Sequence, residues 1–171
     1  MNKKRIIIIR ILTGILTIGI MGLIFSFSMQ NGEESSGLSD VIVEWIQNVI
    51  IQPFQIQNES VNQFLEENLG FIVRKLAHFS IYTALGMSAT GFFLTFESIS
   101  QRNRFLFAGI LGCVYAMTDE IHQLFSPGRS GQVTDVLLDS LGVVFGIAII
   151  YLVQKILFRK QKSTKISQKE K

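Results

Sequence analysis

The sequence predicts an all-α membrane protein with four transmembrane helices. Almost half of its 171 residues, 48%, are hydrophobic, and they gather in long blocks instead of being spread along the chain. The four blocks cover residues 6–27, 71–96, 105–122 and 136–158. Each is close to the length of a helix that crosses a hydrocarbon core of about 30 Å. We therefore expect a four-helix membrane domain over residues 1–160, followed by a basic cytoplasmic tail over residues 161–171.

The first block follows Lys3, Lys4 and Arg5, as the apolar core of a signal peptide follows its basic start. However, the block is longer than the roughly 7 to 15 residues of such a core, and residues 26–30 contain no small-x-small cleavage site of the usual kind. We therefore expect an uncleaved first span. The third block is the shortest, and it fits a membrane when its polar C-terminal end lies at the interface.

The basic residues predict the orientation. They lie before the first block, between the second and third, and after the last: Lys3, Lys4, Arg5, Arg102, Arg104, Arg159, Lys160, Lys162, Lys165, Lys169 and Lys171. These places share one side of a four-span topology, whereas residues 28–73 carry seven acidic residues and no lysine or arginine. By the positive-inside rule, both termini are cytoplasmic and the protein lies in the cell membrane. The basic tail favours contact with anionic lipid headgroups, and nothing in the chain indicates nucleic acid binding.

The long acidic connection over residues 28–73 predicts two short helices along the membrane surface. Apolar residues recur there at spacings of three and four, which places them on one helical face: Leu38, Val41, Ile42, Trp45, Ile46 and Val49. Trp45 is then an interfacial anchor. After Pro53, we expect a second helix to begin at Ser60 and to stop near Gly70. These helices cover the outer end of the bundle, or alternatively form a lid that handles a substrate.

Glycines inside the blocks predict close contacts between helices. Gly142 and Gly146 form a G-x-x-x-G pattern, and further pairs lie in the other blocks: Gly14 with Gly22, Gly86 with Gly91, and Gly109 with Gly112. The same pattern can mediate dimerisation, but within a four-helix chain we favour contacts inside the bundle. The sequence does not determine the oligomeric state.

Ionisable residues gather at block ends that alternate along the chain. The second block opens with Arg74, Lys75 and His78. The third block closes with Asp119, Glu120, His122 and Gln123, and the last block opens with Asp135 and Asp139. Arg129 lies in the connection between the third and last blocks. Because successive spans run in opposite directions, all of these residues fall at the outer end. Ionisable residues at such depth are costly, so a cluster of both signs indicates a functional site. We expect an outward-facing polar pocket.

Several chemistries fit this set. A histidine oriented by a carboxylate can move protons near neutral pH, and the candidates for catalysis are His78, Asp119, Glu120, His122 and Asp135. An anionic lipid-linked or phosphorylated ligand needs cationic and polar contacts, and the candidates are Arg74, Lys75, Gln123, Arg129 and Asp139. Imidazole and carboxylate groups also suit a divalent metal, but no known ligand spacing is matched, so we assign no metal ligand and no cofactor. The structural alternative is a salt-bridge network that joins three helices.

The same residues lie in segments with a recognisable pattern. These are Arg74 to Phe79 with Tyr82 and Gly86, then Tyr115 to Gln123 with Pro127 to Ser130, and finally Asp135, Val136 and Gly142. This combination resembles the VanZ-like family of bacterial membrane proteins, and the similarity extends over all four blocks. Asp139 departs from the pattern, because the family more often has asparagine at that position.

The resemblance implies a bacterial integral membrane protein, and the founding member of the family is associated with low-level resistance to the glycopeptide teicoplanin. We therefore expect a contribution to teicoplanin-type resistance at the cell envelope, with a glycopeptide or an anionic cell-wall precursor as partner. One alternative is a membrane-embedded hydrolase or transferase that acts on a lipid-linked or cell-wall precursor. The other is a non-catalytic binding or structural protein of the envelope. Whether the protein is an enzyme stays open on the sequence alone.

Overall fold

A computed structural model of the chain describes residues 3–30, 32–51, 59–126 and 131–169. Its elements are α1 (Lys3–Ser28), α2 (Gly32–Ile46), the π-helical turn η1 (Gln47–Ile51), α3 (Glu59–Leu94), α4 (Gln101–Gln123) and α5 (Val133–Lys169). No strand occurs within these ranges. The predicted all-α class is confirmed, and each of the four apolar blocks lies mostly or wholly within one of the long helices α1, α3, α4 and α5.

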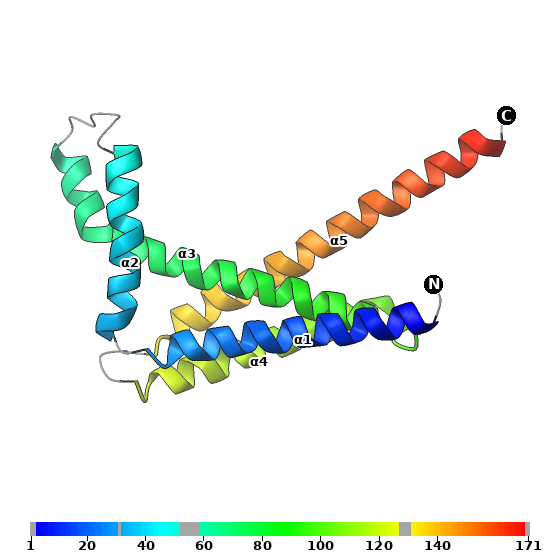
Figure 1. Cartoon of the computed structure of the whole chain (residues 1–171), viewed down its shortest axis with the longest axis horizontal. Helices are drawn as coiled ribbons and strands as arrows, with labels where there is room; N and C mark the ends of the chain where they lie inside the picture. The colour runs from blue at the N-terminus through cyan, green and yellow to red at the C-terminus, as the bar shows by residue number, and fades with distance from the viewer. Residues whose placement is uncertain (1–2, 31, 52–58, 127–130, 170–171) are drawn as a thin grey trace.

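The long helices run alongside one another, and α2 stands across one end of them (Figure 1). Helix α3 is central, because it packs against α1, α4 and α5. The first part of α3 turns away from the rest and lies next to α2, while the last part of α5 leaves the bundle (Figure 1). Both termini lie toward the end opposite α2. We call the two ends of the bundle the α2 end and the terminal end.

Helices α3 and α5 approach each other closely because glycines line their crossing. A side chain on Gly86 would strike the backbone of Val143, and one on Gly146 would strike the backbone of Thr83. A Cβ atom on Gly142 would come 2.7 Å from a backbone carbonyl oxygen of α3. Small residues allow such backbone contact between membrane helices. The G-x-x-x-G pattern is therefore used inside the chain, as the sequence predicted.

The hydrophobic core is small, and most apolar side chains point away from it. Its buried residues come from all four long helices: Ile24, Tyr82, Leu85, Ala116 and Val143. Among the described residues, two helices are long and apolar enough to cross a membrane, Lys3–Ser28 and the segment Val133–Leu157. Only 11% and 22% of the residues in their most apolar windows are buried. A core helix of a soluble protein would be mostly covered by protein, so these helices indicate a membrane protein.

The connection before α3 differs from the prediction. A helix does form over the first predicted segment, as α2 and η1, and its apolar residues Trp45 and Val49 are exposed. The second predicted helix begins at Glu59, one residue early, but it does not stop near Gly70 and continues as α3. A glycine within a helix costs only about 1 kcal/mol, and burial of Leu69 beside it offsets that cost. Pro53 lies outside the described residues.

The prediction for Gly22 needs correction. Gly22 has no atom within 4 Å of the position of an added Cβ, so it makes no close helix contact, although its predicted partner Gly14 lies against Phe92. The basic segment after residue 160 is helical, because α5 continues through it to Lys169. Helix propensity explains this continuation, since lysine and glutamine are good helix formers.

Candidate functional site

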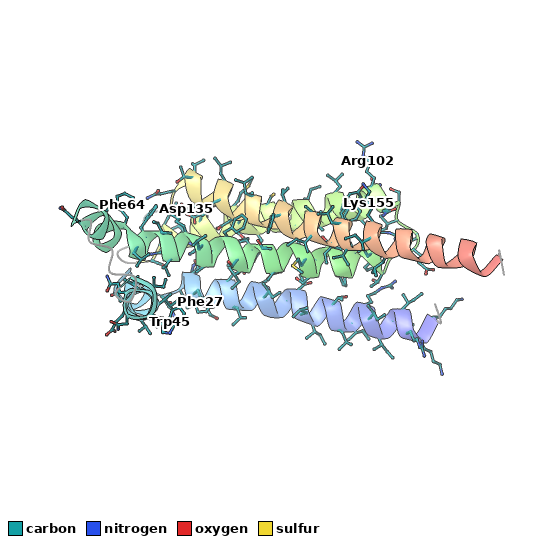
Figure 2. The ribbon with its side chains drawn as sticks, turned by 90° about the horizontal axis from the view of Figure 1, so that it is seen from above. Phe27, Trp45, Phe64, Arg102, Asp135 and Lys155 are labelled. Atoms are coloured by element: carbon teal, nitrogen blue, oxygen red, sulfur yellow. The ribbon has the colours of Figure 1, made fainter. Side chains whose placement is uncertain are left out.

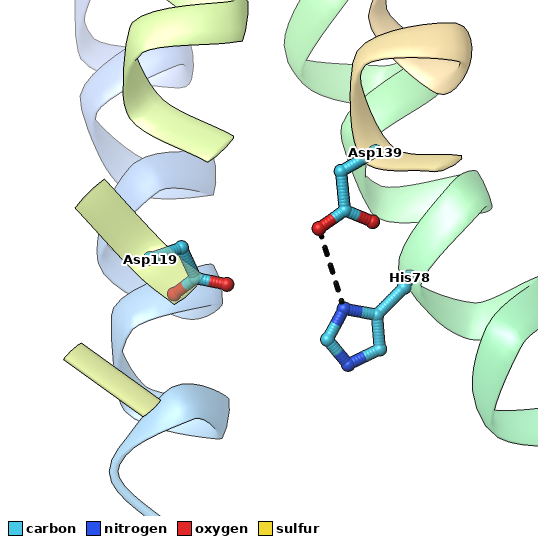
Figure 3. Close-up of side chains that lie close together, drawn as sticks. All are labelled: His78, Asp119 and Asp139. Atoms are coloured by element: carbon cyan, nitrogen blue, oxygen red, sulfur yellow. Dashed lines mark ion pairs between the residues drawn. The ribbon is translucent and has the colours of Figure 1, made fainter. Parts of the chain in front are cut away.

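Three side chains from three helices meet near the α2 end of the bundle. His78 of α3, Asp119 of α4 and Asp139 of α5 each offer an oxygen or nitrogen atom, and these atoms lie within 4.8 Å of one another. The Nδ1 atom of His78 is 3.7 Å from Oδ2 of Asp139. Figure 3 shows the Asp119 carboxylate pointing toward the other two side chains. We call these three residues the His-Asp-Asp cluster.

The glycine crossing positions Asp139. Asp139 precedes Gly142 by three residues and Gly146 by seven, so all three lie on the face of α5 that presses against α3. Asp139 is 0% exposed at this close approach, and Asp119 of α4 is 5% exposed. Neither oxygen of Asp139 has a hydrogen-bond partner among the described residues. A buried carboxylate in this state is energetically costly, which is unusual for a purely structural group.

Tyr82 belongs to the same site, and the sequence reasoning did not select it. Its side chain is 0% exposed, and its hydroxyl makes no hydrogen bond among the described residues. The charges of Asp119 and Asp139 both act on this hydroxyl. Tyr82 follows His78 by one helical turn, so the i, i+4 spacing was the signal in the sequence that would have found it.

One turn closer to the helix ends, Lys75 and Asp135 form an ion pair between α3 and α5. Both side chains are about four-fifths buried, with 24% and 19% exposed. The Lys75 ammonium also lies 5.0 Å from the centre of the Phe71 ring. Lys75, predicted to bind a ligand, and Asp135, predicted to be catalytic, therefore neutralise each other's charge. This ion pair is a second side-chain contact between α3 and α5, after the pair of His78 and Asp139.

Glu120 and Gln123 support the site from α4. Oε2 of Glu120 accepts a hydrogen bond of 2.9 Å from the backbone N–H of Gln132, which ties the end of α4 to the start of α5. The amide nitrogen of Gln123 donates to Oδ2 of Asp119 at 3.2 Å and so fixes that carboxylate. Both side chains are buried. Their contacts are those of positioning residues for Asp119 and for the α5 N-terminus.

His122 packs against α1. Its ring packs on Phe25 of α1, with the ring centres 4.8 Å apart, and its Nδ1 atom is buried without a hydrogen bond among the described residues. Nearby, the Ser126 hydroxyl donates to the backbone carbonyl of Ser28 at 3.1 Å and joins the ends of α4 and α1. His122 is not one of the three side chains whose donor atoms lie within 4.8 Å of one another.

Of the two predicted arginines, the structure describes Arg74. Arg74 is half-buried on the face of α3 that also carries His78, one turn away. Its Nε atom has no hydrogen-bond partner, and no carboxylate forms an ion pair with Arg74 among the described residues. Arg129 lies outside the described residues.

A further cation, Arg10, was not predicted because it falls inside the first apolar block. Its guanidinium donates to the backbone carbonyl of Thr95 at 2.8 Å and to the hydroxyl at 3.1 Å. It also lies 4.1 Å from the centre of the Phe96 ring. Thr95 follows His78 by about 25 Å along α3, so this contact belongs to the terminal end. Arg10 joins α1 to α3 there and takes no part in the His-Asp-Asp cluster.

Chemically, the cluster combines one imidazole, two buried carboxylates and one buried phenol. Such groups can transfer protons or hold a cation, and Arg74, which has no ion-pair partner among the described residues, lies one turn away.

Comparison with known proteins gives one match. The family model described as VanZ/LLP1 matches residues 13–154, a range that contains every residue of the candidate site. No curated protein and no solved structure matches the chain.

Proposed function

The chain belongs to the VanZ/LLP1 family, and we propose that it crosses the cell membrane four times and binds the anionic part of an envelope molecule at its outer end. The observation that carries this proposal is the convergence of buried, incompletely paired polar groups at the α2 end, with Arg74 beside them.

The side-chain directions of α4 support a third membrane span between α3 and α5. Its outward face is a stripe of apolar residues that are each more than half exposed: Leu106, Ile110, Val114, Met117 and Ile121. This stripe extends over about 22 Å at the rise of an α-helix. The opposite face buries Ala116, Asp119 and Gln123. The polar residues Asp119, Glu120 and Gln123 therefore face protein. The exposed Thr118 donates its hydroxyl to the backbone carbonyl of Tyr115 at 2.8 Å, so lipid meets mainly the apolar stripe.

Helix α3 is supported as a span by its central position. It is covered by α1, α4 and α5, and it buries the polar side chains Ser88 and Thr90 against them. Both hydroxyls donate to backbone carbonyls of α3 itself, at 3.0 and 2.7 Å. A helix surrounded by protein needs no continuous apolar surface, so its polar residues are compatible with membrane depth.

The distribution of charge supports an external position for the site. Arg102 and Lys155 lie toward the terminal end, whereas Asp135 and Trp45 lie toward the α2 end (Figure 2). Cytoplasmic segments carry the excess of lysine and arginine. This distribution supports a cytoplasmic position for the terminal end and an outer position for the α2 end with its His-Asp-Asp cluster. The exposed Trp45 of α2 would then lie at the lipid headgroups.

Arg74 supports an anionic ligand. Lys75 is matched by Asp135, but Arg74 has no carboxylate partner among the described residues although it is half-buried. A guanidinium can hold a phosphate or carboxylate through two parallel hydrogen bonds. An anionic group on Arg74 would lie one helical turn from His78. A lipid-linked cell-wall precursor has both the anionic group and the apolar chain that such a position requires.

A membrane-embedded enzyme is the second candidate. Asp139 and Tyr82 are fully buried, and their polar atoms lack hydrogen bonds among the described residues. Proton-transferring groups in enzymes are often held in such surroundings. In this candidate function, the protein is a hydrolase or transferase whose substrate is the anionic molecule on Arg74. Both candidate functions use the same ligand site. They differ in the role of His78, which is essential for turnover in an enzyme and dispensable after ligand binding in a binding protein.

The role in glycopeptide resistance can be tested in a susceptible bacterium. We compare wild type, Arg74→Gln and the control Arg102→Gln at equal membrane abundance, and measure susceptibility to teicoplanin and vancomycin. Wild type and the control should protect against teicoplanin, and Arg74→Gln should lose the protection. Full protection by Arg74→Gln would contradict a role for this arginine, and no protection by the wild type would contradict the resistance role.

A further inference from the structure

We propose that the His-Asp-Asp cluster is a binding site for a divalent transition-metal ion, with His78, Asp119 and Asp139 as its protein ligands. The three donor atoms lie within 4.8 Å of one another. Donors around a tetrahedral zinc ion are about 3.3 Å apart, given metal distances of about 2.0 Å. The separation of 3.7 Å between His78 Nδ1 and Asp139 Oδ2 is already close to that value. Small side-chain rotations would bring the third donor to the same distance.

The surroundings of Asp139 are the second observation that indicates a ligand. This side chain is 0% exposed, and both of its oxygens lack hydrogen-bond partners among the described residues. Folding has removed the carboxylate from water without supplying the contacts that normally replace water. A bound cation would supply them. The oxygen that is closest to His78 faces the space between α3 and α4, where Asp119 points from the other side (Figure 3).

The balance of charge agrees with a cation of charge +2. Asp119 and Asp139 contribute two negative charges when ionised, and a histidine that binds a metal is neutral. The nearby Lys75 is already paired with Asp135. A divalent ion would therefore neutralise the cluster.

The ligand types select the class of metal. One imidazole and two carboxylates suit zinc, manganese, iron(II) or cobalt(II), whereas magnesium and calcium prefer sites made only of oxygen ligands. Three protein ligands leave at least one position open, which is typical of catalytic sites. The Tyr82 hydroxyl and Arg74 lie one turn from His78 on either side along α3. Any fourth ligand would therefore bind between a phenol and a guanidinium.

The Gln123 side chain takes a supporting role in this site. Its amide donates to Oδ2 of Asp119 at 3.2 Å, which leaves the other oxygen of Asp119 for a metal. Metal-binding carboxylates usually have such an outer hydrogen bond, which orients them and tunes their affinity. The same contact explains why an uncharged glutamine is buried beside the acids.

The test uses the full-length protein in detergent and zinc alone. Metal is removed with a chelator, zinc is added back, and bound zinc is measured by mass spectrometry after gel filtration. The affinity is then measured by competition with a chromogenic chelator. Wild type should bind about one zinc ion per chain, and Asp139→Asn and His78→Gln should each weaken binding about tenfold or more. The control Glu97→Gln removes an exposed acid at the terminal end and should bind as the wild type does.

Thermal unfolding separates metal binding from folding. Zinc should raise the unfolding temperature of the wild type and of Glu97→Gln, and should leave that of Asp139→Asn unchanged. If Asp139→Asn does not fold, His78→Gln at its half-buried position provides the same comparison. Equal zinc binding by wild type and Asp139→Asn, or no binding by the wild type, would overturn the proposal. Because no lipid or antibiotic is present, this outcome is independent of the proposed function.

Discussion

Replacing Gly142 with alanine tests whether the glycine crossing positions the site. The added Cβ atom would lie 2.7 Å from the backbone oxygen of Phe79, about 0.7 Å short of the 3.4 Å at which ordinary contact begins. Backbone atoms cannot rotate away, so α5 must move from α3 by several tenths of an ångström. Overpacking of this kind costs about 1 to 3 kcal/mol, and the better helix propensity of alanine returns about 1 kcal/mol. We expect a net loss of about 0 to 2 kcal/mol, and a stability about 1 to 3 kcal/mol below that of a glycine-to-alanine variant without the clash.

The loss should also reach the His-Asp-Asp cluster, because Asp139 is three residues before Gly142 and His78 is next to Phe79. The assay is unfolding in detergent, with the fraction folded followed by circular dichroism. The matched control is Gly22→Ala, since no atom lies within 4 Å of its added Cβ. This variant should be as stable as the wild type or slightly more stable. If Gly142→Ala is as stable as Gly22→Ala, the close crossing of α3 and α5 is wrong.

Three further predictions follow from individual contacts. A double-mutant cycle with Lys75→Ala and Asp135→Ala should give a coupling of about 0.5 to 1 kcal/mol in detergent unfolding, and zero coupling would contradict the ion pair. Arg10→Ala should lower the unfolding free energy by about 1 to 3 kcal/mol, and Arg10→Lys should restore only part of it, because lysine cannot donate twice in one plane to Thr95. Tyr82→Phe should leave stability unchanged or raised, since its hydroxyl lacks a hydrogen bond among the described residues; a loss above about 1 kcal/mol would reveal a missing partner.

Much of the fold could be predicted because apolar block length and helix length are closely related. The four blocks identified the four long helices, and the glycine spacing identified the tight face of α5. The end of the helix at Gly70 was wrong, because a single glycine is a weak stop signal when the residues on both sides are helical and nearby Leu69 and Val73 are buried. The continuation of α5 to Lys169 was missed because hydropathy marks the lipid boundary and not the end of the helix.

The site was predicted as a group, but its internal pairing was not. Spacing along one helix shows that Arg74, His78 and Tyr82 share a face, and it does not show how that face is rotated against its neighbours. That rotation depends on the glycine contacts of α3 with α5, which pair Lys75 with Asp135. Spacing likewise does not show that His122 of α4 packs on Phe25 of α1. The charges alone do not determine which of these residues pair with one another, and they give no reason to select the uncharged Tyr82.

The most direct measurement for the central claim is the binding of an anionic lipid headgroup to Arg74. Purified wild type, Arg74→Gln and Arg102→Gln are compared in detergent with a chelator present, and the unfolding temperature is measured with a short-chain polyprenyl phosphate and with the matching alcohol. We predict that the phosphate, and not the alcohol, stabilises wild type and Arg102→Gln, and that Arg74→Gln gives no response. Equal stabilisation of Arg74→Gln, or no effect of the phosphate on the wild type, would contradict an anion-binding site at the outer end.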